Sequence, residues 1–506
     1  MAAPILIGFV PSWISVWLTP LWLIGVGAAV ALVILLLMWG VLLVISRRAA
    51  ASVPLAISEG VLTPILAMVC LLALLGVGGT FMVIRPHEYY QSIVRYPSTG
   101  TISKEVKIGE PQDGPEGVRP QEVAIEIIGD ELSQFTVRSA NSLIVSSVPN
   151  DDDVSEILFQ TNGGEDFVWS RQSSTTNPIL GKVYDKLLIT NLGDTATTLT
   201  LGLETTPLHP EVSAIPWVAL SIVAVVLLHM VLRVAIPKIS AIALATTKSE
   251  IVQPIYLLLL VMGAVLLYLF IFIPYHTFGE DIKVLKSSGL TLIMVFGIIQ
   301  AVWAASNAIA DELEGRTALT VLSKPIGRRQ FVIGKFVGIL WSVFLMFILL
   351  GTLFLFIVSY KVIFEARESS LPEPEWQVCF LEVVQTIPGL ILGFLEAVVL
   401  TAISVAISTR LPMLPNAMIC FSIYVAGHLT PLIVQSSLGN FEPVQFVGQF
   451  IATVFPVLEY FNSDAAVAAG RTVPISYLGV SLLYCALYST IAMLLALALF
   501  EDRDIA

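Results

Sequence analysis

Long apolar runs, broken by short polar segments, make up most of this chain. A helix of roughly 20 apolar residues crosses about 30 Å of hydrocarbon, and the runs are of that length or longer. We therefore expect about nine transmembrane helices, at approximately 22–45, 61–84, 215–234, 255–274, 288–309, 331–359, 379–408, 412–435 and 475–500. Residues 237–254 mix apolar positions with Lys238, Lys248 and Glu250, which is typical of an interfacial helix.

Residues 86–213 have a different pattern. Short runs such as Glu122–Ile128 and Lys186–Thr190 are separated by turn-forming pieces rich in Gly, Asn and Asp. Many short strands punctuated in this way predict a β-sandwich. The expected fold class is an all-α polytopic membrane protein with an inserted β-sandwich. Its expected domains are two N-terminal helices (1–85), the β-rich domain (86–213), a third helix (214–236) and a six-helix core (237–506).

The composition agrees with a membrane protein and places the excess charge in one segment. Of the 506 residues, 56% are hydrophobic and only 13% are charged, whereas soluble proteins carry about a quarter charged residues. The net charge is −12, and residues 86–213 hold 19 acidic and 8 basic side chains, against 19 and 18 in the rest of the chain. A segment this acidic argues against nucleic acid or anionic lipid headgroups as its partner.

A charged island, residues 308–335, lies between two of the expected spans. Lys and Arg near the ends of spans stay on the cytoplasmic side, and the island contains Arg316, Lys324, Arg328, Arg329 and Lys335. With nine spans, this places residues 86–213 outside and the C-terminus inside. Apolar or small residues recur there at steps of three and four, which predicts a short amphipathic face suited to docking. The alternative is an ordinary basic loop without a partner.

The island also resembles a known family. The segments Glu314-Gly315-x-Thr317 and Leu322-Ser323-Lys324-Pro325, with Arg328 and Gly334-Lys335, are similar to the cytoplasmic loop of permease subunits of type-2 ABC (ABC-2) transporters. The nearest resemblance is to the subgroup of multi-copper-enzyme maturation permeases. It covers about residues 237–503, and the first three spans and the β-rich domain are additional to it.

This resemblance implies a function and partners. The loop would be the coupling segment, here 311–335, which docks on a separate ABC ATPase subunit that carries ATP and Mg. The residues implied in coupling are Glu314, Gly315, Thr317, Leu322, Lys324, Pro325, Arg328 and Lys335. The resemblance further implies a homodimer of permease subunits in a cell membrane of the bacterial inner-membrane type, and it favours export.

Ionisable residues at membrane depth are the remaining candidates for a site. Glu396 is expected in mid-span, where an ionised carboxylate is costly, so it should face the bundle interior or be protonated. Two roles stay open for it: lining a translocation path, or making a hydrogen bond between helices. His229 and His428 are expected to be packing residues.

No cofactor or metal site is predicted on this chain. The sequence lacks GxxxxGK[ST], the loop that cradles the phosphates of ATP, so hydrolysis is not expected here. Residues 88–207 contain no His, Cys or Met to bind copper. Asp151–Asp153 with Glu156 could bind a hard cation, although such a run is usually a solvated loop. The cysteines, Cys70, Cys379, Cys420 and Cys485, imply no disulfide framework.

Two functions from different classes therefore remain. The first is the membrane-spanning permease subunit of an ABC transporter, without enzyme activity of its own, for which a neighbouring reading frame with an ATPase motif would be evidence. The second is a membrane-anchored receptor or scaffold whose β-sandwich binds an envelope partner. The sequence does not identify the transported substrate.

Overall fold

The chain divides into two units, which are described separately. The β domain comprises Ile84–Ala214, and the membrane unit comprises Met1–Val83 and Ile215–Ala506. The computed structural model describes residues 11–110, 113–114, 117–118, 120–147, 156–171, 183–273, 280–311, 327–435, 446 and 455–501.

The β domain contains two four-stranded antiparallel sheets. One has the strand order β1-β10-β5-β8, and the other has the order β4-β9-β6-β7. The first sheet is formed by β1 (Thr101–Ile108), β10 (Thr197–Thr205), β5 (Leu132–Arg138) and β8 (Phe167–Ser170). The second is formed by β4 (Gln121–Ile128), β9 (Val183–Asn191), β6 (Leu143–Ser147) and β7 (Glu156–Thr161). The remaining elements are α4 (Pro86–Arg95), η2 (Tyr96–Ser98), β2 (Asp113–Gly114), β3 (Gly117–Val118), η3 (Gly129–Glu131) and η4 (Pro210–Ser213).

One apolar core joins the two sheets. Leu199, Leu201 and Leu203 alternate along β10 and are buried, because every second residue of a strand faces the same side. They share a cluster with Tyr184 and Leu187 of β9 in the opposite sheet. The predicted β-sandwich is therefore confirmed.

The membrane unit is helical, as predicted. Within the described residues, six helices are long and apolar enough to cross a membrane, and up to eight spans result if each of two bent helix pairs is one span. The helices are α1 (Ser12–Ile45), α2 (Arg47–Ser58), α3 (Thr63–Gly79), α5 (Ala214–Ala235), α6 (Pro237–Val252), α7 (Pro254–Leu269), α8 (Asp281–Ala305), α11 (Arg328–Glu368), α12 (Trp376–Ser408), α13 (Met413–Gln435), α15 (Asp464–Ala468) and α16 (Ile475–Glu501). Two short turns are η5 (Ser306–Asp311), a π-helix that continues α8, and η7 (Leu458–Phe461).

The structure differs from the nine predicted spans in three places. α2 and α3 meet at 97°, and α6 and α7 meet at 62°. The apolar part of α13, Met413–Leu429, is shorter than the six long helices. At the second bend Pro254 starts α7, and the residue before a proline is forced into extended backbone, as Gln253 is at ψ 140°. The Gln253 side chain accepts hydrogen bonds from Trp303 Nε1 (2.7 Å) and Asn307 Nδ2 (2.9 Å) and so fixes the bend to α8 and η5.

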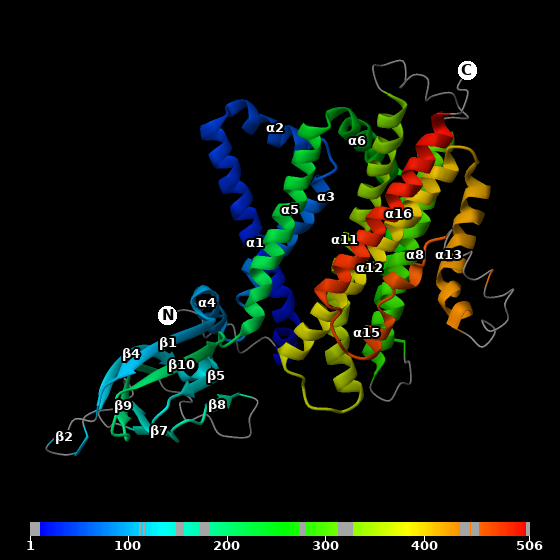
Figure 1. Ribbon diagram of the computed structural model, residues 1–506. Helices are drawn as coiled ribbons and strands as arrows, with labels where there is room; N and C mark the ends of the chain where they lie inside the picture. Colours follow the sequence, from blue (N-terminus) through cyan, green and yellow to red (C-terminus); the bar gives the residue numbers. More distant parts are fainter. Residues whose placement is uncertain are drawn as a thin grey trace. The chain divides into compact units, whose positions relative to one another are not determined.

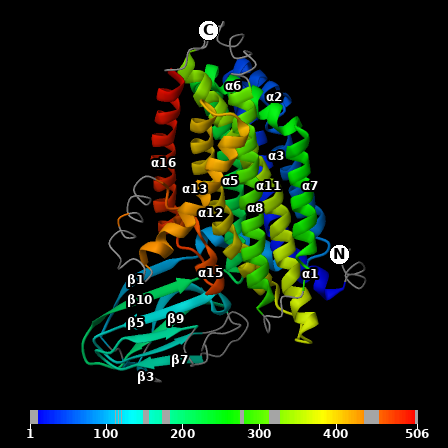
Figure 2. The same cartoon turned by 90° about the vertical axis from the view of Figure 1, so that its right-hand side faces the viewer.

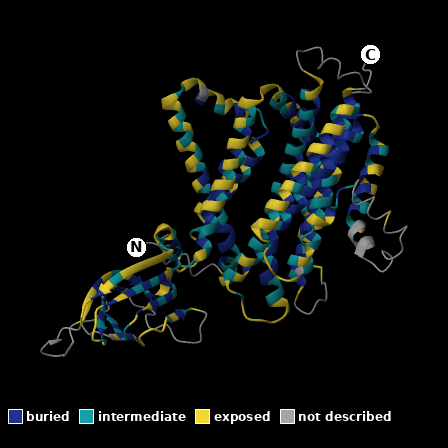
Figure 3. Ribbon diagram, in the orientation of Figure 1, coloured by how far each residue is buried: buried dark blue, intermediate teal, exposed yellow. Residues whose placement is uncertain are grey.

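α11 and α12 form the centre of the membrane unit. In Figures 1 and 2 they run beside α8 and α16, and both helices contact α8 and α16. In the most apolar stretch of α12, 72% of the residues are buried inside the protein, whereas in that of α1 only 11% are buried. Figure 3 shows this difference as dark central helices and a largely exposed α1. Exposed apolar side chains on the outer helices are what a hydrocarbon surrounding requires.

α6 packs closely along the first half of α11. A Cβ atom at Gly338 would lie 2.6 Å from the backbone oxygen of Ala243, so only glycine permits this approach. Thr247 Oγ1 donates to the Gly338 carbonyl at 2.9 Å across the same interface. The segment expected to be an interfacial helix is thus a separate helix that is tightly held to α11.

Charge differs between the two ends of the membrane unit. One end, called the basic end here, carries the Arg47–Arg48 pair, Arg233, Lys238, Lys248, Arg328, Arg329 and Arg410. Two contacts at this end link segments that are distant in the sequence: Arg233 on α5 pairs with Glu59 (2.5 Å), and Arg328 Nη1 on α11 donates to the carbonyl of Glu501 on α16 (2.9 Å). α3 begins shortly after Glu59, and Arg233 lies in the last turn of α5, so both helices run from the basic end toward the opposite end of the membrane unit.

The opposite end holds more carboxylates. Its lysines are neutralised locally, since Lys286 pairs with Glu382 and Lys361 lies 3.7 Å from Asp281. Lys361 was expected in a loop after a span ending near residue 359. It is instead fully buried inside α11, which continues to Glu368, and its ammonium donates to the carbonyl of Ile271 at 3.1 Å.

Candidate functional site

Glu396 is the buried acid of the membrane core. It lies on α12, which continues through Pro388 without a break. Only 1% of the surface of Glu396 is exposed. Its Oε1 atom is 3.0 Å from Nε2 of His428 on α13. Glu396 therefore contacts a neighbouring helix, and it also lines the cavity described below.

His428 connects Glu396 to a second carboxylate. Its Nδ1 atom lies 3.4 Å from Oε2 of Glu459 on η7, whose side chain is 45% exposed. The imidazole thus lies between a buried acid and an accessible one. Such an arrangement can pass a proton between the two carboxylates, because each ring nitrogen can donate or accept. His428 thus has hydrogen-bond partners at both ring nitrogens, whereas His229 packs edge-on against Trp341.

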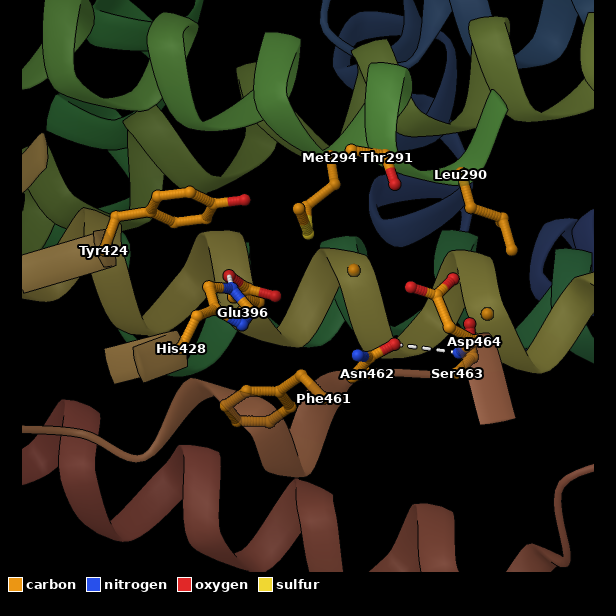
Figure 4. A pocket seen from close by; sticks show the side chains of 12 residues that line it. Leu290, Thr291, Met294, Glu396, Tyr424, His428, Phe461, Asn462, Ser463 and Asp464 are labelled. Carbon is orange, nitrogen blue, oxygen red and sulfur yellow. Dashed lines mark hydrogen bonds and ion pairs between the residues drawn. The ribbon is translucent and has the colours of Figure 1, made fainter. Parts of the chain in front are cut away.

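A cavity of about 210 Å³ lies beside this pair. Figure 4 shows Glu396 and Asp464 on opposite sides of it, with Met294 and Thr291 on one wall and Asn462 on another. Gly389, Gly393 and Glu396 share one face of α12, at steps of four and three. The two glycines have no side chain to occupy this space. Sequence reasoning missed the set, although small residues spaced with Glu396 on one face were a usable signal.

The predicted coupling residues are only partly described. Glu314, Gly315, Thr317, Leu322, Lys324 and Pro325 lie outside the described residues. Arg328 is at the start of α11 and exposed, and its neighbour Arg329 pairs with Glu501 Oε1 at 3.0 Å. Lys335 is buried, with its ammonium 5.5 Å from the centre of the Phe331 ring. Of these two predicted residues, Arg328 is the one on the surface.

A buried polar cluster lies where α8 passes into η5. Asn416 Nδ2 on α13 is within 2.9–3.0 Å of the hydroxyls of Ser306, Ser404 and Ser408. Ser306 begins the π-helical turn η5, which leads toward residue 312. π-Helical turns are rare and are frequent at functional sites. The cluster therefore anchors this unusual turn to α12 and α13, a contact that sequence reasoning did not foresee.

The described residues contain no group of three or more His, Cys, Asp or Glu side chains arranged to hold a metal ion. The acidic run Asp151–Asp153 lies outside the described residues.

Comparison with known families decides what kind of membrane protein this is. The profile of the ABC-2 family transporter proteins matches residues 179–505, which is more than half of the chain. The chain belongs to the ABC-2 transporter family. The match begins in front of β9 and so includes the end of the β domain and α5, further toward the N-terminus than the resemblance near residue 237. Comparison with curated proteins gave no significant match. As an ABC-2 family member, the chain is the membrane component of a transporter.

Proposed function

We propose that this chain is the permease subunit of an ABC exporter and is driven by ATP hydrolysis on a separate ATPase subunit. The family match over residues 179–505 carries the proposal. In it, segment 311–335 is the coupling segment, ATP and Mg are bound by the partner ATPase, and two permease subunits form the working complex. The finer resemblance, to multi-copper-enzyme maturation permeases, rests on residues 314–335.

The proposed route for substrate passes the cavity beside Glu396. A carboxylate held within the membrane is costly, and such residues commonly mark substrate or ion pathways. Residues of α8, α12 and α13 line the cavity, so a movement of α8 would change the shape of the cavity. α8 also continues through η5 to the coupling segment, which gives a covalent connection between the ATPase-docking region and the cavity.

The charge distribution supports an orientation for the complex. Because Lys and Arg favour the cytoplasmic side, we place the basic end in the cytoplasm, where an ATPase is present. The β domain is inserted in the chain between α3 and α5, which run away from the basic end, so it is then extracytoplasmic, and the C-terminus is cytoplasmic. This is the arrangement of a cell-membrane exporter of the bacterial inner-membrane type.

The test is purification of the tagged chain from its native membrane, followed by identification of co-purifying proteins. The proposal predicts recovery of a protein with an ABC ATPase motif in near-equal amount. If no ATPase were recovered under conditions that keep the permease dimer intact, the second function would lead: a receptor or scaffold whose β domain binds an envelope partner.

A further inference from the structure

A second cavity adjoins the polar one. It is an apolar groove of about 370 Å³ between α8 and α13, lined along α8 from Val295 to Trp303 and along α13 from Met413 to Tyr424. The polar cavity is lined by residues of the same two helices further along, and Tyr424 lines both spaces. The groove and the polar cavity, together called the cleft here, therefore have this side chain in common.

The two halves of the cleft have opposite chemistry. Among the described residues that line the groove, Tyr424 supplies the only hydroxyl, and the others are apolar, aromatic or sulfur-containing. The polar half contains Glu396 and Asp464, and none of its twelve described lining residues is Lys or Arg. Glu459 contacts His428 from the other side of the ring. Even with His428 protonated, three carboxylates face one positive charge.

We propose that the cleft binds an amphiphile with a protonated amine head and an alkyl tail. An ammonium group donates up to three hydrogen bonds and would bond to Glu396 as a charge-assisted acceptor, while Asp464, across the cavity, adds negative charge to the same space. The rings of Tyr424 and Phe461 add faces that attract a cation. The tail would lie in the groove, where it remains in apolar surroundings. The combined volume is that of an ordinary small-molecule site.

This inference names the substrate class of the transport function proposed above and rests on it for its biological meaning. Binding itself is measurable on the full chain in nanodiscs of neutral lipid without any ATPase. Failure to bind and failure to recover an ATPase are thus separate results. The probe is radiolabelled decylamine, with empty nanodiscs subtracted, and decyl sulfate and ethylamine are the competitors.

The wild-type chain should bind decylamine saturably, and decyl sulfate should not compete. Glu396→Gln should weaken binding by about tenfold or more, because a charge-assisted hydrogen bond is lost. Glu250→Gln is the matched control, since Glu250 is equally buried at 1% exposure but lines neither half of the cleft. Its decylamine affinity should equal that of the wild type.

A second pair of variants tests the tail. Ala417→Phe places a ring in the groove and should weaken decylamine binding several-fold, while competition by ethylamine stays as in the wild type. Met418→Phe, on the next residue of α13 but 64% exposed and outside the groove, should bind decylamine normally. Equal competition by decyl sulfate, or unchanged binding in both Glu396→Gln and Ala417→Phe, would overturn the proposal. So would efficient cross-linking of Phe421→Cys between two copies, since the groove would then be a subunit interface.

Discussion

Glu396 Oε1 and His428 Nε2 lie 3.0 Å apart and join α12 to α13 inside the membrane unit. Removing the imidazole would leave a carboxylate, 1% exposed, without this partner. Leaving a buried hydrogen-bonding group unpaired costs about 1–3 kcal/mol, and more if the group is charged, whereas replacing both partners by apolar groups is much milder.

The first prediction follows from this pair. His428→Ala should lower the thermal unfolding midpoint of the purified chain clearly, and Glu396→Gln should lower it less, because the amide still hydrogen-bonds to the imidazole. Combining His428→Ala with Glu396→Leu should recover part of the loss. The measurement is thermal unfolding in detergent at matched protein concentration. Equal midpoints for His428→Ala and the wild type would contradict a stabilising pair.

A second prediction concerns the packing of α6 on α11. Gly338→Val should force these helices apart, because an added Cβ would lie 2.6 Å from the Ala243 oxygen, and overpacking of this kind costs about 1–3 kcal/mol. Gly479→Val on α16 is the control, as nothing lies within 4 Å of its Cβ position. Thermal stability should fall for the first variant and stay near the wild-type value for the second. The reverse order would show that the close contact is absent.

The third prediction tests the anchor of the π-helical turn. Asn416→Ala removes the amide shared by Ser306, Ser404 and Ser408 and leaves buried hydroxyls with fewer partners, at a cost of about 1–3 kcal/mol. Ser422→Ala on the same helix should be nearly neutral, since its exposed hydroxyl bonds only within α13. The measurement is the thermal unfolding midpoint of each variant. Equal midpoints for Asn416→Ala and Ser422→Ala would show that the cluster does not anchor η5.

Hydropathy and charge predicted those parts of the architecture that depend only on the local sequence pattern. Six long apolar helices and the β-sandwich follow directly from run length and from strand periodicity. The two bends were not predicted, because hydropathy reports how apolar a segment is and not its direction. The angle at Gln253 depends on hydrogen bonds from Trp303 and Asn307, which are 50 and 54 residues away along the chain.

Only part of the candidate site was predicted, because the sequence pattern does not show which distant residues pack together. Glu396 was identified because a carboxylate in an apolar run is conspicuous. Its partner His428 lies 32 residues away, and Glu459 lies 31 residues beyond His428. Only the packing of α13 and η7 against α12 brings these three side chains together. The cleft required the same tertiary information.

Topology provides the fourth prediction. A reporter fused within the β domain at Gly163 should be active only outside the cytoplasm, and a reporter fused at Ala506 should be active only inside, because basic residues collect at the end that carries α16's C-terminus. Alkaline phosphatase and fluorescent-protein fusions at both positions provide complementary readouts. The same location for both fusions would contradict the proposed orientation and the side on which an ATPase could dock.

In the proposed function, segment 311–335 couples this permease to a separate ATPase. Glu314→Ala combined with Arg328→Ala removes charge-assisted hydrogen bonds worth about 1.5–3 kcal/mol each if both contact the ATPase. Glu375→Ala is the control, since it is an exposed carboxylate at the other end of the membrane unit. The most direct measurement is the amount of ATPase that co-purifies with each permease at matched membrane abundance. We expect reduced capture by the double variant and wild-type capture by the control. Undiminished capture by the double variant would contradict this coupling role.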